Sequence, residues 1–193
     1  MGTLKLNTTS GGSLSIQAAD GASDNTLTLP AVTGGNIVTT ADSGTITQGM
    51  IGSNVVGKGP AFHAYPSATT SASHSVWTKV PINTERFDTN SNFDTSTYRF
   101  TPTVAGYYSV TGMVSFGENI ASVEAGLSVN GSIAYGGTAN WSNNVNSMTT
   151  ALIYFNGSTD YVELYAIQWS GVTKTIQNSA STVRFEAHLV RAA

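Results

Sequence analysis

The sequence predicts an all-β fold of the sandwich type, and three observations support that prediction. Apolar and polar residues alternate over short runs, as they do in strands with one buried face. These runs recur at intervals of roughly 8–12 residues, and no stretch between them has a helical period. Two Asn-Gly pairs, Asn130–Gly131 and Asn156–Gly157, mark tight turns. Strands of this length and spacing are typical of two packed sheets.

The distribution of aromatic residues divides the chain of 193 residues into two parts. The first 60 residues contain no Phe, Tyr or Trp, whereas every aromatic side chain lies between Phe62 and Phe185. A domain of about 130 residues is of common size and can bury a full core. We therefore expect a shaft or attachment segment at residues 1–57 and a head domain at residues 58–193.

The N-terminal segment has the pattern of short strands without the means to form a core of its own. Leu14 and Ile16, then Leu27 and Leu29, alternate with polar residues between clusters of Gly, Ser, Asn and Asp. Single rows of Leu and Ile bury too little area, at about 25 cal/mol per Å², to offset an ordering cost of roughly 1–2 kcal/mol per residue. The segment is therefore either disordered in the isolated chain or buried against copies of itself in a fibrous or extended form, and the alternation favours the second.

The head begins its regular alternation at Tyr108. Tyr108, Val110, Val114 and Phe116 occupy one face of a strand, and small hydroxyl residues occupy much of the other. Asn130–Gly131 then lies between two apolar runs and predicts a two-residue hairpin, and Asn156–Gly157 repeats the pair after a further apolar run. The polar interval at residues 136–147 predicts a loop.

Two late strands complete the head. In the first, Val162, Leu164 and Ala166 share one face, and Tyr161, Glu163 and Tyr165 share the other. We expect the aliphatic face to fill the sandwich. The opposite face is then a candidate trimer interface, formed by Tyr161, Glu163 and Tyr165. The closing strand at residues 183–189 carries Arg184, Glu186 and His188 on its polar face, which in a trimer faces a neighbouring subunit or water.

The aromatic spacing in residues 88–108 resembles the signature of C1q domains. The residues that fit the signature are Asp88, Phe93, Phe100, Gly106 and Tyr108. The sequence departs from it at Ile82, Val110 and Gly112, where the family has aromatic residues. The likeness covers about residues 59–191. It implies a jelly roll of about ten strands that assembles as a homotrimer.

Residues 27–34 resemble short modules of bacteriophage tail-fibre shafts. The animal members of the C1q family carry a collagen stalk and a secretion signal, and this sequence shows neither. We therefore expect a virion protein, assembled in the host cytoplasm. The start of the sequence has no apolar run of signal-peptide length, and no window approaches the roughly 18 apolar residues of a membrane-spanning helix.

Composition limits the classes of partner and chemistry. Charged residues make up 10% of the chain, against about 25% in an ordinary domain, and the net charge is -3. Such a chain offers no basic face to phosphates, so we expect no nucleic-acid partner. The absence of Cys excludes disulfides, thiolate metal sites and Cys nucleophiles.

Catalysis and metal binding have little support in the residues. There are three histidines, His63, His74 and His188, and no Gly-x-Ser-x-Gly motif, so we expect no enzyme. Glycan cleavage needs two carboxylates, and Glu118, Glu124 and Glu163 are candidates for such a pair. Any chain with eleven acidic residues offers such pairs, so the signal is weak. Some C1q-like trimers hold calcium near their axis. By this resemblance, a calcium site with oxygen ligands from Asp and Glu is favoured over a zinc site. One His and one Glu two residues apart provide too few ligands, and we expect neither metal nor cofactor.

Two tryptophans are candidate receptor contacts. Each lies among amides or small residues at an expected strand end, where an aromatic ring can stack on a sugar while neighbouring amides bind its hydroxyls. The alternative for both is a rim contact between subunits. The predicted receptor-binding residues are Asn140, Trp141, Asn143, Asn144 and Trp169.

These observations together predict a trimeric phage fibre or spike subunit that is tail-associated and contributes to host-surface recognition. Its expected partners are two further copies of itself, other virion proteins through the N-terminal segment, and a glycan or protein of the host surface. The first alternative is a purely structural virion trimer, such as a capsid decoration or baseplate component. The second is a spike enzyme that cleaves glycans.

Overall fold

The computed structural model describes residues 3–7, 13–17, 59–117, 120–137 and 145–193. The chain divides into two compact units, Met1–Val55 and Val56–Ala193. In the first unit, β1 (Thr3–Asn7) and β2 (Ser13–Gln17) form an antiparallel pair in which Leu6 lies opposite Leu14. The strand expected at Leu14 and Ile16 is therefore confirmed. The one expected at Leu27 and Leu29 lies outside the described residues.

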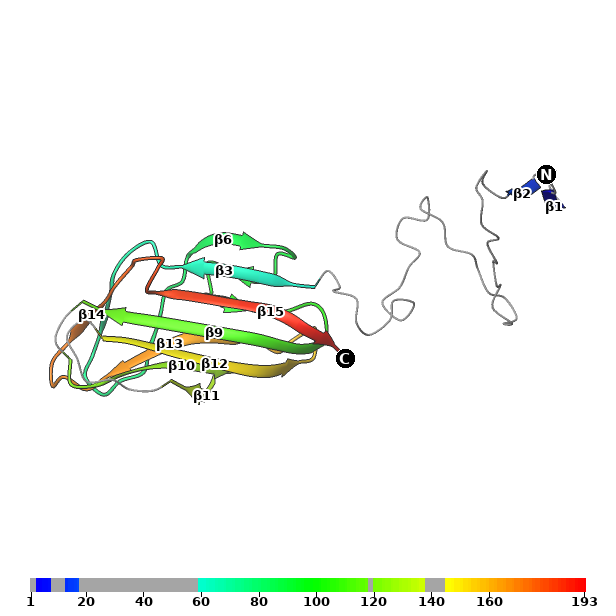
Figure 1. Cartoon of the computed structure of the whole chain (residues 1–193). Helices are drawn as coiled ribbons and strands as arrows, with labels where there is room; N and C mark the ends of the chain where they lie inside the picture. Colours follow the sequence, from blue (N-terminus) through cyan, green and yellow to red (C-terminus); the bar gives the residue numbers. More distant parts are fainter. Residues whose placement is uncertain (1–2, 8–12, 18–58, 118–119, 138–144) are drawn as a thin grey trace, which may run out of the picture. The chain divides into compact units, whose positions relative to one another are not determined.

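The head is built of two antiparallel sheets with no helix in the described residues, which confirms the predicted all-β sandwich (Figure 1). The first, which we call the β9 sheet, has the order β4-β14-β9-β15-β3-β6, and β12 also pairs with β9. Its strands are β3 (Ala61–Tyr65), β4 (Thr70–Ala72), β6 (Thr84–Asp88), β9 (Gly106–Phe116), β12 (Val145–Phe155), β14 (Lys174–Ile176) and β15 (Arg184–Ala192).

The second sheet, the β13 sheet, has the order β11-β10-β13-β8-β7, with β5 also paired to β13. Its shortest members are pairings of two residues each, so the head has more separate strands than the ten implied by the C1q resemblance. The strands are β5 (Thr78–Lys79), β7 (Phe93–Asp94), β8 (Arg99–Phe100), β10 (Val123–Val129), β11 (Ser132–Gly136) and β13 (Val162–Gln168).

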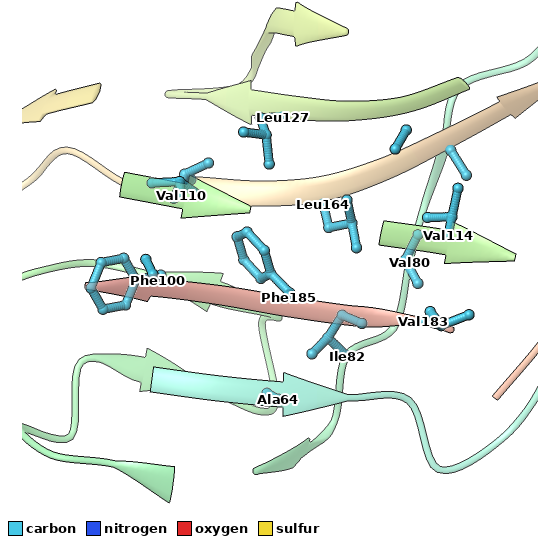
Figure 2. Packing of buried hydrophobic residues seen from close by; sticks show 14 of the residues in the cluster. Ala64, Val80, Ile82, Phe100, Val110, Val114, Leu127, Leu164, Val183 and Phe185 are labelled. Atoms are coloured by element: carbon cyan, nitrogen blue, oxygen red, sulfur yellow. The ribbon is translucent and has the colours of Figure 1, made fainter. Parts of the chain in front are cut away.

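The core lies between the sheets and is formed by the alternating apolar positions. Figure 2 shows Val110 and Phe185 of the β9 sheet facing Leu127 and Leu164 of the β13 sheet. Leu164 also explains Gly112, one of the positions where the sequence departs from the C1q pattern. A Cβ at Gly112 would lie 2.4 Å from Leu164 Cδ1, so the leucine fills the space that a larger residue on β9 would need.

Aromatic rings fill the half of the core near the start of β9. Phe62 stacks on Phe93 and Phe100 at centroid distances of 4.7 and 4.5 Å. Tyr108 meets Phe100 edge to face at 5.7 Å, and its hydroxyl donates a hydrogen bond to the carbonyl of Val104. Burial raises the pKa of Tyr108 to about 12. Phe100 and Tyr108 are both fully buried.

The two Asn-Gly pairs have different roles. Asn130 and Gly131 adopt φ values of 50° and 85° between β10 and β11, which confirms the predicted hairpin. Asn156–Gly157, in contrast, connects β12 of one sheet to β13 of the other, so a hairpin there is wrong. The Asn156 side-chain oxygen accepts hydrogen bonds from the backbone N–H groups of Ser158, Thr159 and Asp160. This wider turn allows the chain to change sheets.

The chain enters the head beside its own last strand. The carbonyl of Pro60, just before β3, accepts a hydrogen bond from the Leu189 amide of β15. The backbone amide of Ala193 is bonded to the Ala105 carbonyl, just before β9. The start of β3 and the C-terminus therefore lie at one end of the sandwich, and β14 lies at the opposite end (Figure 1).

Candidate functional site

The outer surface of the β9 sheet carries large apolar side chains in solvent. Tyr107 of β9 lies opposite Tyr154 of β12, and their rings meet at 5.4 Å. Leu152 and Met148 continue the row along β12, and their exposed fractions are 60% and 53%. Because alternate residues of both strands fill the core, these four point away from it. Together they form an apolar strip on β9 and β12.

A polar strip runs beside it on β15 and β3. Glu186 lies 3.6 Å from His63 Nε2 and 3.6 Å from Arg184 Nε. Burial lowers the pKa of His63, although the charge of Glu186 opposes the shift. The Nδ1 atom of His63 is buried with no hydrogen-bond partner among the described residues. The neutral form of this imidazole is therefore favoured.

The outer face of the β13 sheet has a different character, with a buried carboxylate at its centre. Glu163 of β13 has a side chain that is 3% exposed, and its Oε1 accepts hydrogen bonds from Lys79 Nζ and Arg99 Nε, both at 2.6 Å. Burial is the largest influence on the Glu163 pKa and raises it. The bonds and charges of Lys79 and Arg99 outweigh that influence, so the net pKa is lowered and the group is a carboxylate.

Three tyrosines surround this ion cluster. The guanidinium of Arg99 lies over the ring of Tyr161, 4.1 Å from its centroid. Lys79 Nζ lies 5.7 Å from the ring centroid of Tyr98. The Tyr165 hydroxyl donates a long hydrogen bond of 3.4 Å to Glu163 Oε2. We call Lys79, Arg99, Glu163 and the three tyrosines the Glu163 cluster.

The structure therefore brings the predicted trio Tyr161, Glu163 and Tyr165 together on one face, as their spacing predicted. The partners of Glu163 come from its own chain. Whether the trio also contacts a second subunit stays a prediction.

Trp169 follows directly after β13, at the end of the sandwich away from Pro60. It is half-buried, and its amide donates a hydrogen bond to the Ser122 carbonyl. The other predicted receptor residues, Asn140, Trp141, Asn143 and Asn144, lie outside the described residues. Of the described residues that flank them, Gly137 donates its amide to the Ala125 carbonyl of β10, and Val145 of β12 pairs with Phe116 of β9.

Sequence reasoning missed the exposed apolar strip and the two cations of the Glu163 cluster. The strip was detectable in part, because Leu152 and Tyr154 alternate with Ile153 and Phe155, so one pair has to face outward. Lys79 and Arg99 gave no such signal, since they lie 84 and 64 positions before Glu163.

We next consider metal binding, membrane spanning and glycan cleavage in the part of the chain that is described. No group of three or more His, Cys, Asp or Glu residues there can hold a metal ion. Within the same residues, no helix is long and apolar enough to cross a membrane. Of the carboxylates considered for glycan cleavage, Glu163 is engaged by two cations and Glu118 lies outside the described residues.

Comparison with known proteins identifies the fold. No family model matches the chain, and no curated protein matches it significantly. A structure of murine APRIL at pH 5.0 superposes with a TM-score of 0.56 and 11% identity, covering 69% of this chain and 100% of that chain. A second murine APRIL structure, at pH 8.5, gives a TM-score of 0.55 and 12% identity over the same shares. The head has the C1q/TNF-like jelly-roll fold.

The globular domain of zebrafish complement 1qA is also similar to this C1q/TNF-like head. It has a TM-score of 0.49 and 17% identity, and the match covers 70% of this chain and 100% of that chain. At these identities the likeness concerns the fold. The function of the C1q/TNF-like head has to be inferred from its own surfaces.

Proposed function

We propose that the chain is a subunit of a homotrimeric bacteriophage fibre or spike, tail-associated, whose C1q/TNF-like head contributes to recognition of the host surface. The observation that carries the trimer is the exposed apolar strip of Tyr107, Tyr154, Leu152 and Met148. Large apolar side chains that line one face of a soluble domain mark a surface for association.

A second and third copy of the chain are the partners that fit this face. The polar strip beside the apolar one carries both signs of charge, on Arg184 and Glu186, so the face can meet copies of itself without net repulsion. The trio Tyr161, Glu163 and Tyr165 offers less, because Glu163 is already paired within its own chain. We therefore place the principal subunit contact on the β9 sheet.

The virion role rests on the sequence. Residues 27–34 resemble phage shaft modules, and an N-terminal segment with short strands suits attachment to other virion proteins. The host contact is proposed at the end of the head that carries Trp169, with Asn140, Trp141, Asn143 and Asn144 in the same patch. This end lies away from Pro60, where the chain enters the head.

Sedimentation velocity tests the trimer. The full-length chain is expected to sediment as a trimer at micromolar concentration, and Leu152→Glu to shift it to folded monomer. Ile133→Glu is the matched control, because Ile133 is an exposed apolar residue of the β13 sheet and its replacement should leave the trimer intact. A stable wild-type monomer contradicts the trimer, and a trimeric Leu152→Glu variant contradicts the β9-sheet contact.

Imaging of intact particles with gold-labelled antibody to the head tests the virion role. Labelling of the tail, together with blocked adsorption by soluble head, supports the recognition function. Labelling of the capsid or baseplate with unchanged adsorption favours the alternative, a purely structural virion trimer.

A further inference from the structure

The Glu163 cluster contains two cations and one carboxylate, so one positive charge is not neutralised within the cluster. Lys79 and Arg99 both donate to the same oxygen of one buried carboxylate. One cation neutralises Glu163, and Lys79 does so while also donating to the carbonyl of Thr97. Burial of a charge demands a partner but does not demand two. The charge of Arg99 is therefore available to a further anion.

The geometry of Arg99 leaves its binding edge open. It uses Nε for Glu163, and the face of its guanidinium lies on Tyr161. Its two terminal amino groups make no hydrogen bond to any described residue, and 41% of the side chain is exposed. Two parallel N–H groups at a fixed planar edge match the two oxygens of a carboxylate.

Tyr98, the residue before Arg99, is held in a costly backbone conformation. Its φ is 59°, in the left-handed region that a bulky residue rarely adopts. The strain is imposed by the turn that begins at Asp94, whose carbonyl accepts the Tyr98 amide at 2.7 Å. Asp94 also fixes Ser96 and Thr97 through its carboxylate. The turn thus presents a half-exposed tyrosine ring whose centroid lies 5.7 Å from Lys79 Nζ.

Two other acidic residues lie near the cluster, and neither joins it. Asp94 pairs in register with Arg99, but its carboxylate oxygens accept hydrogen bonds from Ser96 and Thr97. Asp160, which precedes Tyr161, is engaged by Asn130 and Asn156. Among the described residues, neither forms an ion pair with Lys79 or Arg99. The open edge of Arg99 therefore stays without an acidic partner.

We propose that the Glu163 cluster binds the carboxylate of an acidic saccharide, with Arg99 holding the carboxylate and Tyr98 lying against the sugar ring. Aromatic rings beside a few fixed polar groups suit the mixed apolar and hydroxyl surface of a sugar. Lys79 adds a second positive charge to the site, and it keeps Glu163 paired when the ligand binds Arg99. The inference rests on the proposed role in surface recognition and names a ligand class for it, at a site separate from the Trp169 end.

Isothermal titration of the full-length chain tests the proposal with trigalacturonic acid as the probe and its methyl ester as the neutral control. We expect saturable binding of the acid and binding of the ester weaker by about tenfold or more, since the ester lacks the charge-assisted bonds. Arg99→Lys keeps a cation beside Glu163 but removes the planar edge. It should weaken binding of the acid by about tenfold.

Arg86→Lys is the matched control, because Arg86 also lies over a tyrosine, Tyr65, at 5.9 Å but belongs to the β9 sheet, whereas Glu163 belongs to the β13 sheet. It should bind the acid as the wild type does. Tyr98→Gly is the second variant, since glycine accepts a positive φ without strain, so the fold is retained while the ring is lost. It should also weaken binding.

The proposal is overturned if the acid shows no saturable binding up to about 10 mM, roughly tenfold above the Kd of a weak ligand that binds at about 1 mM. Equal binding of acid and ester overturns it too, as does equal loss in the Arg99 and Arg86 variants. If binding is absent while soluble head still blocks adsorption, the saccharide site fails and the recognition function stands. If the acid binds but soluble head leaves adsorption unchanged, the site stands and the recognition function fails.

Discussion

His63 is a titratable side chain placed where its charged form is disfavoured. Its side chain is 13% exposed, its Nδ1 has no partner among the described residues, and burial holds its pKa below the ordinary value of 6.5. Glu186 opposes that shift, and the charges of Arg86 and Arg184 add to it. An unfolded chain binds the proton more readily than the folded one, so protonation favours unfolding.

We therefore predict that acid weakens the head through His63. The stability that the neutral imidazole contributes is complete above pH 6.5 and is lost as the pH falls through the lower pKa of the folded state. His63→Gln should flatten the pH dependence of the unfolding free energy in this window, measured by urea denaturation. His188→Gln is the control, because it leaves His63 in place. An unchanged pH profile in His63→Gln would contradict the prediction.

Glu163 shows how far single residues could be predicted from the sequence. Its alternation with Val162 and Leu164 correctly placed it on the outer face of its strand. Nothing in that pattern showed that the carboxylate is buried, because its cover comes from Lys79 and Arg99, far away along the chain. Alternation is a local property, whereas the partners of a charge depend on which strands become neighbours.

At the scale of elements, the turn at Asn156 is held by one side chain. The side-chain oxygen of Asn156 accepts hydrogen bonds from three backbone N–H groups, and its Nδ2 donates a hydrogen bond to Thr159 Oγ1 at 2.8 Å. Asn156→Ala should lower the unfolding free energy by about 1–2 kcal/mol, because several donors lose their acceptor. Asn178→Ala, which removes one side-chain hydrogen bond to Ser67, should cost less. Denaturant midpoints compare the two, and equal costs would contradict a special role for Asn156.

The two Asn-Gly pairs also show why the connections between strands are harder to predict than the strands themselves. Both pairs follow an apolar run, and both contain a glycine with positive φ. Only Asn130–Gly131 closes a hairpin. At Gly157, a Cβ would lie 2.4 Å from the amide nitrogen of Ala105, so this glycine allows a close approach to another loop. That contact is long-range and leaves no mark on the residues around the pair.

At the scale of the whole molecule, we predict that the head folds and assembles without the N-terminal segment. A chain that begins at Gly59 retains every strand of both head sheets. Its apolar strip on β9 and β12 is also complete. Circular dichroism should show a β-rich protein, and sedimentation should show a trimer. Expression only as aggregate would place the segment within the folding unit.

The general architecture was predictable because aromatic spacing and alternation identify a sandwich with a defined inner face. The pairing of strands was less so. β3 and β15, the first and last strands of the head, are neighbours, and β9 pairs with both β12 and β15. These pairings depend on how the two sheets close over the core, and Phe62 and Phe185 meet there at 5.1 Å.

The placement of the two ends of the head has a consequence for genetic fusion. Pro60 is bonded to Leu189, and Ala193 is tied to Ala105, so both ends of the head chain lie at the same pole of the sandwich. A peptide fused after Ala193 would emerge at the same pole of the sandwich as Pro60. A peptide inserted at Gly171, between β13 and β14, would be displayed at the opposite pole. A Cβ at Gly171 would meet no atom within 4 Å, so the loop has room for an inserted peptide.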